Sequence, residues 1–153
     1  MPSHICHILF ADEALAAGLG PGALAALGSS RPLFHFAAQG PDFFFHNGFS
    51  RPSGRTFGSL LHRRQIGAVV RVMSGRLRER PSEELRAFVL GFATHAFLDR
   101  AAHPFIDYFA GWEDPTDPQT RKYYRCHAFY ERIIDVLFLR ERRSLAPEQL
   151  AAE

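Results

Sequence analysis

The sequence predicts an all-α protein, a single-domain helical bundle of about five helices. Apolar residues recur at spacings of three and four in four stretches of the 153-residue chain, the period of an amphipathic helix. No run of alternating β-branched residues bounded by hairpin turns competes with them. A chain of this length buries about 68 to 70% of its unfolded surface. One domain spanning residues 1–153 can therefore hold a hydrophobic core without disulfides.

The first third of the chain predicts two helices and a long connection. The first helix covers about residues 7–17 and ends at the glycine-rich stretch GLGPG, and a short one follows over 22–27. Residues 28–55 contain several X-Pro steps, which favour an irregular or briefly helical segment. A connection of this length is often functional.

The stretch TFGSLLHRRQIGAVVRVMSGRL, residues 56–77, predicts the next helix. His62 lies on its apolar stripe, and the period of 3.6 residues turns Arg64 and Arg71 away from that stripe. The other members of the stripe are Ile66, Val69 and Met73.

The fourth helix is predicted over 82–100, with Ser82 as the N-cap and acidic residues in the first turn. His95 and Asp99 share one face with apolar side chains, inside about 80° of arc. The apolar residues of that face are Leu85, Phe88 and Phe92. A buried carboxylate needs a compensating cation, and no Lys or Arg lies on the stripe. A bound metal ion would meet that need.

His103 follows four residues after Asp99 and precedes Pro104. The proline ring disfavours α geometry at the preceding residue, so we expect the helix to break there. The break would turn His103 away from an ion held by His95 and Asp99, and leave it to serve a second ion.

The last helix is predicted over residues 119–143. His127 and Glu131 stand four residues apart on one face, so both side chains can reach a single ion. Arg125 and Arg132 are predicted to point outward. Other residues expected on the face of the His-Glu pair are Tyr124, Ile134 and Phe138.

Charge, cysteine usage and the start of the chain exclude several classes of protein. The formal net charge is +2, too small to argue for a nucleic-acid partner. Cys6 and Cys126 are too few for a disulfide framework. The start MPSHICHILFADEAL lacks the basic region of a signal peptide, and no apolar run is long enough to span a membrane. We expect a cytoplasmic protein.

The histidines and carboxylates predict a metal centre. Imidazole nitrogen with carboxylate oxygen and no thiolate suits catalytic zinc or a similar divalent ion. The alternative is a set of three buried pairs of histidine and acid that only hydrogen-bond. A small domain rarely buries that many ionisable groups without using them, which favours the metal.

Read in order, the motifs HILFADEAL, QGPDFF, LHRR, GFATHAFLDRAAHPF and HAFYERIID resemble those of the zinc-dependent phospholipase C family. The resemblance runs from about His7 to Asp135. It implies the all-helical fold that this family shares with single-strand-specific zinc nucleases. It also implies two to three zinc ions in one cleft.

The resemblance assigns ligands residue by residue. It implies that His62, His95 and Asp99 hold the first zinc and that His103, His127 and Glu131 hold the second. It implies that Asp42 bridges the first and third ions and that His7 holds the third. Pro2, exposed by loss of Met1, or His4 is a further candidate ligand of the third ion. The resemblance places Phe43 against a choline head group, and a core position is the alternative. Asp135 lies one turn beyond Glu131, either behind a ligating histidine or as a solvated acid.

Three features depart from the family. Its members are secreted, whereas we expect this chain to be cytoplasmic. Its members also offer a mature N-terminal tryptophan to the third zinc, whereas this chain starts Met-Pro. The phospholipases also continue for many residues after the last ligand, whereas this chain ends 22 residues after Glu131. We expect a short version of the domain that lacks part of the substrate wall.

The resemblance implies a phosphodiester hydrolase of phospholipase C type, in which a hydroxide made available by zinc, oriented by Asp42, attacks a phospholipid phosphodiester. One alternative is a nuclease that uses the same three zinc ions on single strands. The other is a non-catalytic binding protein that zinc only stabilises. Phenylalanines next to Asp42 favour a lipid or related phosphodiester as substrate, with no stable nucleic-acid partner.

Overall fold

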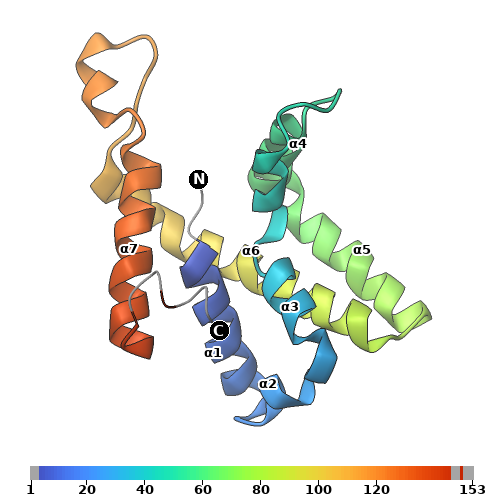
Figure 1. Cartoon of the computed structure of the whole chain (residues 1–153). Helices are drawn as coiled ribbons and strands as arrows, with labels where there is room; N and C mark the ends of the chain where they lie inside the picture. The colour runs from blue at the N-terminus through green and yellow to red at the C-terminus, as the bar shows by residue number, and fades with distance from the viewer. Residues whose placement is uncertain (1–3, 146–148, 150–153) are drawn as a thin grey trace. The chain divides into compact units, whose positions relative to one another are not determined.

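A computed structural model describes residues 4–145 and 149, and within them the chain is helical and contains no strand (Figure 1). This confirms the all-α prediction. The α-helices are α1 (His4–Leu19), α2 (Ala23–Ala26), α3 (Arg31–Ala37), α4 (Gly54–Leu60), α5 (Ile66–Glu79), α6 (Glu83–Ala110) and α7 (Cys126–Arg143). Shorter helical segments are η1 (Gly28–Ser30), η2 (Gly40–His46), the π-helical η3 (Leu61–Gln65) and η4 (Pro118–Tyr123).

The chain divides into two compact units. One, here the central unit, comprises residues 10–98. The other, the terminal unit, comprises residues 1–9 and 99–153. Each is described by itself below, and the single domain expected for residues 1–153 stays a prediction.

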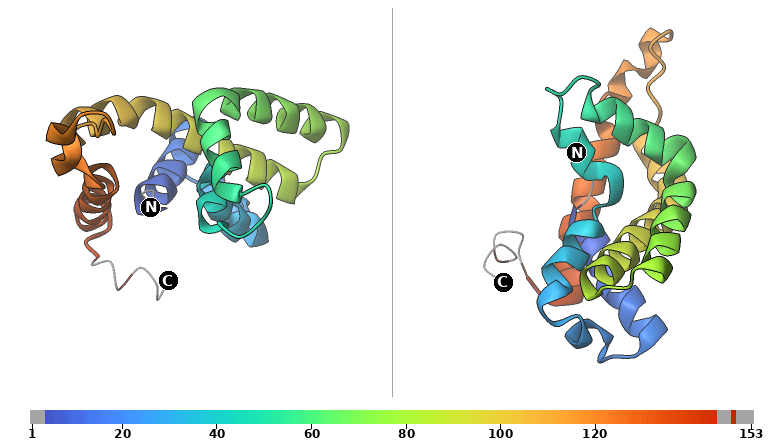
Figure 2. Two further views of the ribbon diagram at one scale, coloured as in Figure 1. Left: turned by 90° about the horizontal axis from the view of Figure 1, so that it is seen from above. Right: turned by 90° about the vertical axis from the view of Figure 1, so that its right-hand side faces the viewer.

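The core of the central unit lies where α1, α3 and α6 meet. Phe34 of α3 is fully buried, and small residues from α1 and α6 let these helices approach it. The buried cluster consists of Ala11, Leu15, Phe34, Ala38 and Ala87, with Ala23, Leu24, Leu27 and Leu90 packed against it. Helix α5 and the start of α6 form a helical hairpin (Figure 2). At its turn, the Ser82 hydroxyl accepts a hydrogen bond from the Leu85 amide at 3.0 Å, which confirms the predicted N-cap.

One stretch of the central unit matches the prediction, and the next differs from it. Residues 28–55 are briefly helical, as expected, with η1, α3 and η2, and α3 carries a proline in its first turn, where no helical hydrogen bond is lost. The helix expected over 56–77 is interrupted by the π-helical segment η3. The apolar spacing of a few residues does not distinguish a π turn from an α turn, so this interruption could not be predicted.

The expected break at His103 is wrong, because α6 continues through Pro104 to Ala110. A proline inside a helix removes one backbone hydrogen bond and costs about 3 kcal/mol. Ile106 and Ala110, on the two turns after it, are buried, and their burial offsets part of that cost. Helix α6 therefore keeps His103 one turn beyond Asp99.

The expected start of the last helix at residue 119 is also wrong. Arg125 has a φ of 60°, in the left-handed region, so the chain turns there and α7 starts at Cys126. Tyr124 lies before this turn and is exposed. It is not on the α7 face that carries His127 and Glu131, contrary to the prediction.

In the terminal unit, α7 is linked to the beginning of α1. The buried Asp135 carboxylate accepts hydrogen bonds from the backbone amides of Cys6, at 2.8 Å, and Ile5, at 3.4 Å. These amides belong to the first turn of α1, which has no helical partner for them. Asp135 thus caps the helix that carries His7. Among the described residues, no helix is long and apolar enough to cross a membrane.

Candidate metal centre

In the terminal unit, α6 and α7 bring together His103, His127 and Glu131. One ligand atom from each lies within 4.8 Å of the others. The Nε2 atoms of both histidines face the same oxygen, Oε1 of Glu131, at 3.5 Å for His103 and 3.0 Å for His127. Two nitrogens and a carboxylate oxygen therefore converge on one point.

Burial and the two imidazoles set the charge of this group. Burial favours the neutral acid of Glu131, which is 6% exposed, but hydrogen bonds from His103 and His127 outweigh it and lower the carboxyl pKa from 4.5 to about 2. The hydrogen bond to Glu131 raises the pKa of each histidine above 6.5, against the opposing effect of burial. A protonated imidazole or a metal ion can supply the positive charge that this carboxylate needs.

Asp107 is a member of this site that the sequence analysis missed. Its Oδ1 lies 3.0 Å from Nδ1 of His127, on the opposite side of the ring from Glu131. A carboxylate at Nδ1 holds the proton there and leaves Nε2 for a metal ion. Asp107 follows His103 by one helical turn, and that spacing was the only signal in the sequence.

Asp99 contacts two histidines of the terminal unit. Its Oδ1 lies 3.5 Å from Nε2 of His7, and its Oδ2 lies 3.7 Å from Nδ1 of His103. His103 is therefore not turned away from Asp99, which is the consequence of the unbroken α6. His4 is the first residue of α1, whereas Pro2 lies outside the described residues.

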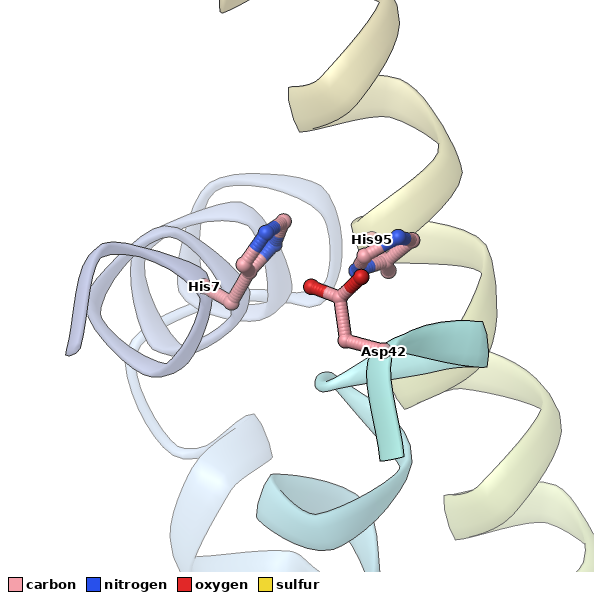
Figure 3. A group of neighbouring side chains, drawn as sticks. All are labelled: His7, Asp42 and His95. Carbon is pink, nitrogen blue, oxygen red and sulfur yellow. The ribbon is translucent and has the colours of Figure 1, made fainter. Parts of the chain in front are cut away.

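In the central unit, η2, η3 and α6 bring together Asp42, His62 and His95. Nε2 of His62 lies 2.8 Å from Oδ1 of Asp42. A ligand atom of His95 lies within 4.8 Å of one from each of the other two. Figure 3 shows the Asp42 carboxylate beside the His95 ring. Asp42 is 2% exposed and His95 is fully buried. His95 also precedes Asp99 by one turn on the continuous α6.

Gly40 makes room for this arrangement. Its φ is +54°, a conformation that favours glycine, and a Cβ atom at this position would collide with the ring of His95. The motif QGPDFF therefore needs its glycine, because the chain turns tightly against His95 before it presents Asp42.

The tautomer of His62 shows that the central group fits a cation. Its Nδ1 lies 2.7 Å from the backbone carbonyl oxygen of Gly58, which only accepts, so the Nδ1–H must donate. The Nε2 lone pair then faces the acceptor Oδ1 of Asp42, and only a proton or a metal ion can lie between them. A ligating histidine commonly donates its other N–H to a backbone carbonyl in this way.

The structure also places Phe43, Asp135 and the two remaining histidines of the central unit. The Phe43 ring is half-buried and stacks with Phe36 at 5.5 Å between centroids. Asp135 is buried, so its interpretation as a solvated acid is wrong. His35 pairs with the buried Asp12 at 2.7 Å, and His46 is exposed.

Both groups offer imidazole nitrogens and carboxylate oxygens, the ligand set of catalytic zinc. Donors about 2 Å from one zinc ion lie up to about 4 Å apart, so His103, His127 and Glu131, whose ligand atoms lie within 4.8 Å of one another, need to contract only slightly. The residues present therefore fit zinc.

Comparison with known proteins identifies the family. No curated protein and no solved structure gives a significant match. The family model described as zinc-dependent phospholipase C matches residues 6–152, which is nearly the whole chain and includes both groups of histidine and carboxylate. The chain belongs to the zinc-dependent phospholipase C family.

Proposed function

We propose that this protein is a zinc-dependent phosphodiester hydrolase that releases the phosphorylated head group of a phospholipid. The observation that carries the proposal is the clustering of histidine nitrogens with carboxylate oxygens, a set of donors that suits zinc. His103, His127 and Glu131 would hold one zinc, and His62, His95 and Asp99 another. Asp42 and His7, with His4 or Pro2, would serve a third.

Asp42 is the residue that we assign to the chemical step. When bound, zinc supplies a nucleophilic water at neutral pH and offsets charge on the phosphoryl oxygens. Asp42 is buried at the end of a tight turn and held against His62, so its carboxylate can orient the attacking water and accept its proton.

The side chains around Asp42 support a lipid substrate over a nucleic acid. Phe45 stacks on His62 at 5.3 Å between centroids, and Phe43, Phe44 and Phe57 continue the aromatic contacts. A nuclease would need a basic groove along which bases stack. Arg64 of η3 and Arg71 of α5 are exposed to solvent, whereas the side chain that stacks on His62 is aromatic. An apolar surround is suited to acyl chains.

The test is turnover of short-chain phosphatidylcholine by the zinc-loaded full chain. We expect zinc-dependent release of phosphocholine, and we expect Asp42→Asn to lower kcat/KM by about 100-fold or more while most of the zinc is retained. Asp12→Asn is the matched control, because Asp12 is also buried and faces an imidazole, that of His35, in the same unit. This control should keep its activity.

Two results would contradict the proposal. Cleavage of single-stranded DNA without lipid turnover, at matched zinc, would assign the site to a nuclease. Inactivity on both substrates with zinc fully bound would assign it to a non-catalytic protein that zinc stabilises.

A further inference from the structure

The last turns of α6 expose aromatic side chains on the surface of the terminal unit. Phe105, Tyr108 and Phe109 lie on these turns, and Trp112 follows the end of the helix. Tyr108 is 81% exposed and Trp112 is 72% exposed. Monomeric proteins rarely gather large apolar side chains in this way without a use for them.

These aromatic residues lie on the side of α6 that the metal site does not use. Successive residues are about 100° apart around a helix, which places Phe105 and Phe109 opposite His103 and Asp107. Ile106 and Ala110, on the side of His103, are buried. The exposed stripe is therefore separate from the metal site.

The exposed surface continues onto α7 through Tyr130. The rings of Phe109 and Tyr130 are nearly parallel, with centroids 6.1 Å apart, and Phe105 lies 6.4 Å from Tyr130. Figure 1 shows α7 beside the end of α6. Phe129, Ile133 and Leu137, all exposed, follow within about 80° of arc on α7. We call Phe105, Tyr108, Phe109, Trp112, Phe129, Ile133 and Leu137 the aromatic surface.

Exposed arginines lie beside the α7 part of the aromatic surface, whereas Glu113 and Asp114 follow Trp112. Between Cys126 and Arg140 the acidic residues of α7, Glu131 and Asp135, are both buried, whereas Arg132 and Arg140 are exposed. A surface pocket is lined by Arg125, Ala128, Phe129 and Arg132. It shares Phe129 with the aromatic surface. Its two guanidinium groups can bind a phosphate.

We propose that the aromatic surface docks the protein on an anionic phospholipid bilayer, with a lipid phosphate bound between Arg125 and Arg132. Trp, Tyr and Phe favour the boundary between head groups and acyl chains, and basic residues next to them are attracted to anionic lipids. The proposal rests on a phospholipid being the substrate, and it adds the surface that reaches it.

The test measures binding of the full zinc-loaded chain to phosphatidylcholine vesicles with and without phosphatidylglycerol. We expect binding to the vesicles that contain phosphatidylglycerol and weaker binding as salt is added. Tyr108→Ser with Trp112→Ser, and separately Arg125→Glu with Arg132→Glu, should each lower vesicle binding by about tenfold or more. Phe49→Ser and Arg71→Glu, which remove an exposed aromatic and an exposed charge of the central unit, are the controls and should bind as the unmodified chain does.

A second measurement separates docking from catalysis. Turnover of a monomeric short-chain lipid should be unchanged in the docking variants, whereas turnover of lipid in vesicles should fall with binding. If the unmodified chain turns over neither substrate, the proposed function is contradicted. Vesicle binding by the variants still tests the docking proposal in that case. Equal vesicle binding by all variants would overturn the docking proposal. Concentration-dependent self-association that the same substitutions abolish, without vesicle binding, would assign the surface to a second copy.

Discussion

Each histidine of the His103, His127 and Glu131 group has a carboxylate at both ring nitrogens. Glu131 lies at Nε2 of both rings. Asp99 lies at Nδ1 of His103, and Asp107 lies at Nδ1 of His127. The hydrogen bond from Nδ1 of His127 to Asp107 orients this ring so that its Nε2 can bind zinc. Spacing along one helix predicts His127 with Glu131, whereas Asp107 lies on α6, and its position one turn after His103 was the only sign of it in the sequence.

Asp107 should control the zinc affinity of this site. We expect Asp107→Ala to weaken zinc binding at His103, His127 and Glu131 by about 10- to 100-fold, because the His127 ring loses the group that fixes its tautomer. Asp107→Asn should keep most of the affinity, since an amide oxygen still accepts from Nδ1–H. Competition with a chromophoric chelator measures the affinity.

The control for Asp107 removes the same charge elsewhere on the unit. Glu141 is exposed near the end of α7, so Glu141→Ala should leave zinc binding unchanged. Nitrogen chemical shifts of His127 give an independent measurement, because Asp107→Ala should shift the neutral ring from the Nδ1–H tautomer toward a mixture. Unchanged shifts and affinity in Asp107→Ala would show that Asp107 does not position His127.

At the scale of elements, a feature set by neighbouring residues can be predicted from the sequence, whereas one set by tertiary packing cannot. Ser82 caps α6 as predicted, because the cap depends on residues next to each other in sequence. Pro104 favours a break that does not occur, because tertiary burial of the following turns outweighs the local preference. The left-handed turn at Arg125 and the π turn at His62 likewise depend on packing that a single sequence does not reveal.

Gly40 is the element-scale feature on which the central ligand group depends. Gly40→Ala places a side chain in a left-handed conformation, which costs roughly 1 to 2 kcal/mol, and sets its Cβ against His95. We expect a lower melting temperature and weaker zinc binding in this variant. Gly75→Ala is the control, because Gly75 lies within α5 with open space around its Cβ position, and alanine there should raise stability by about 0.5 to 1 kcal/mol. Equal zinc binding by the Gly40→Ala variant and the unmodified chain would contradict this account of Gly40.

At the scale of the whole molecule, the proposed ligands come from helices far apart in the chain, so zinc should stabilise the entire fold. A metal that binds only the folded state raises its stability by about 4 kcal/mol when present at about 1,000 times its Kd. For a chain of this size that is a rise of roughly 10 °C in melting temperature for each site. Elemental analysis should give about two to three zinc ions per chain, and chelation should lower the melting temperature accordingly. Less than about half an equivalent after reconstitution would contradict the metal centre.

The stabilisation by zinc should also depend on pH, in a direction that the pKa shifts fix. In the metal-free protein the pKa values of His103 and His127 are raised above 6.5. The protonated histidines stabilise the fold through their ion pairs with Glu131. This stabilisation is fully present below pH 6.5 and is lost as the pH rises through the raised pKa values of the two histidines. The Glu131 pKa is lowered from 4.5 to about 2, so its contribution is present above pH 4.5 and is lost only as the pH falls through about 2.

Zinc binding has the opposite dependence, because both histidines must lose their protons to bind it. The drop in melting temperature on chelation should therefore be small at about pH 5.5 and larger at about pH 8. Proton release on zinc binding, measured by calorimetry in buffers of different ionisation enthalpy, should approach about two per terminal-unit site as the pH falls below the raised pKa values. His103→Ala with His127→Ala should remove this release and flatten the pH dependence. A drop in melting temperature that is independent of pH in the unmodified chain would show that zinc does not replace these protons.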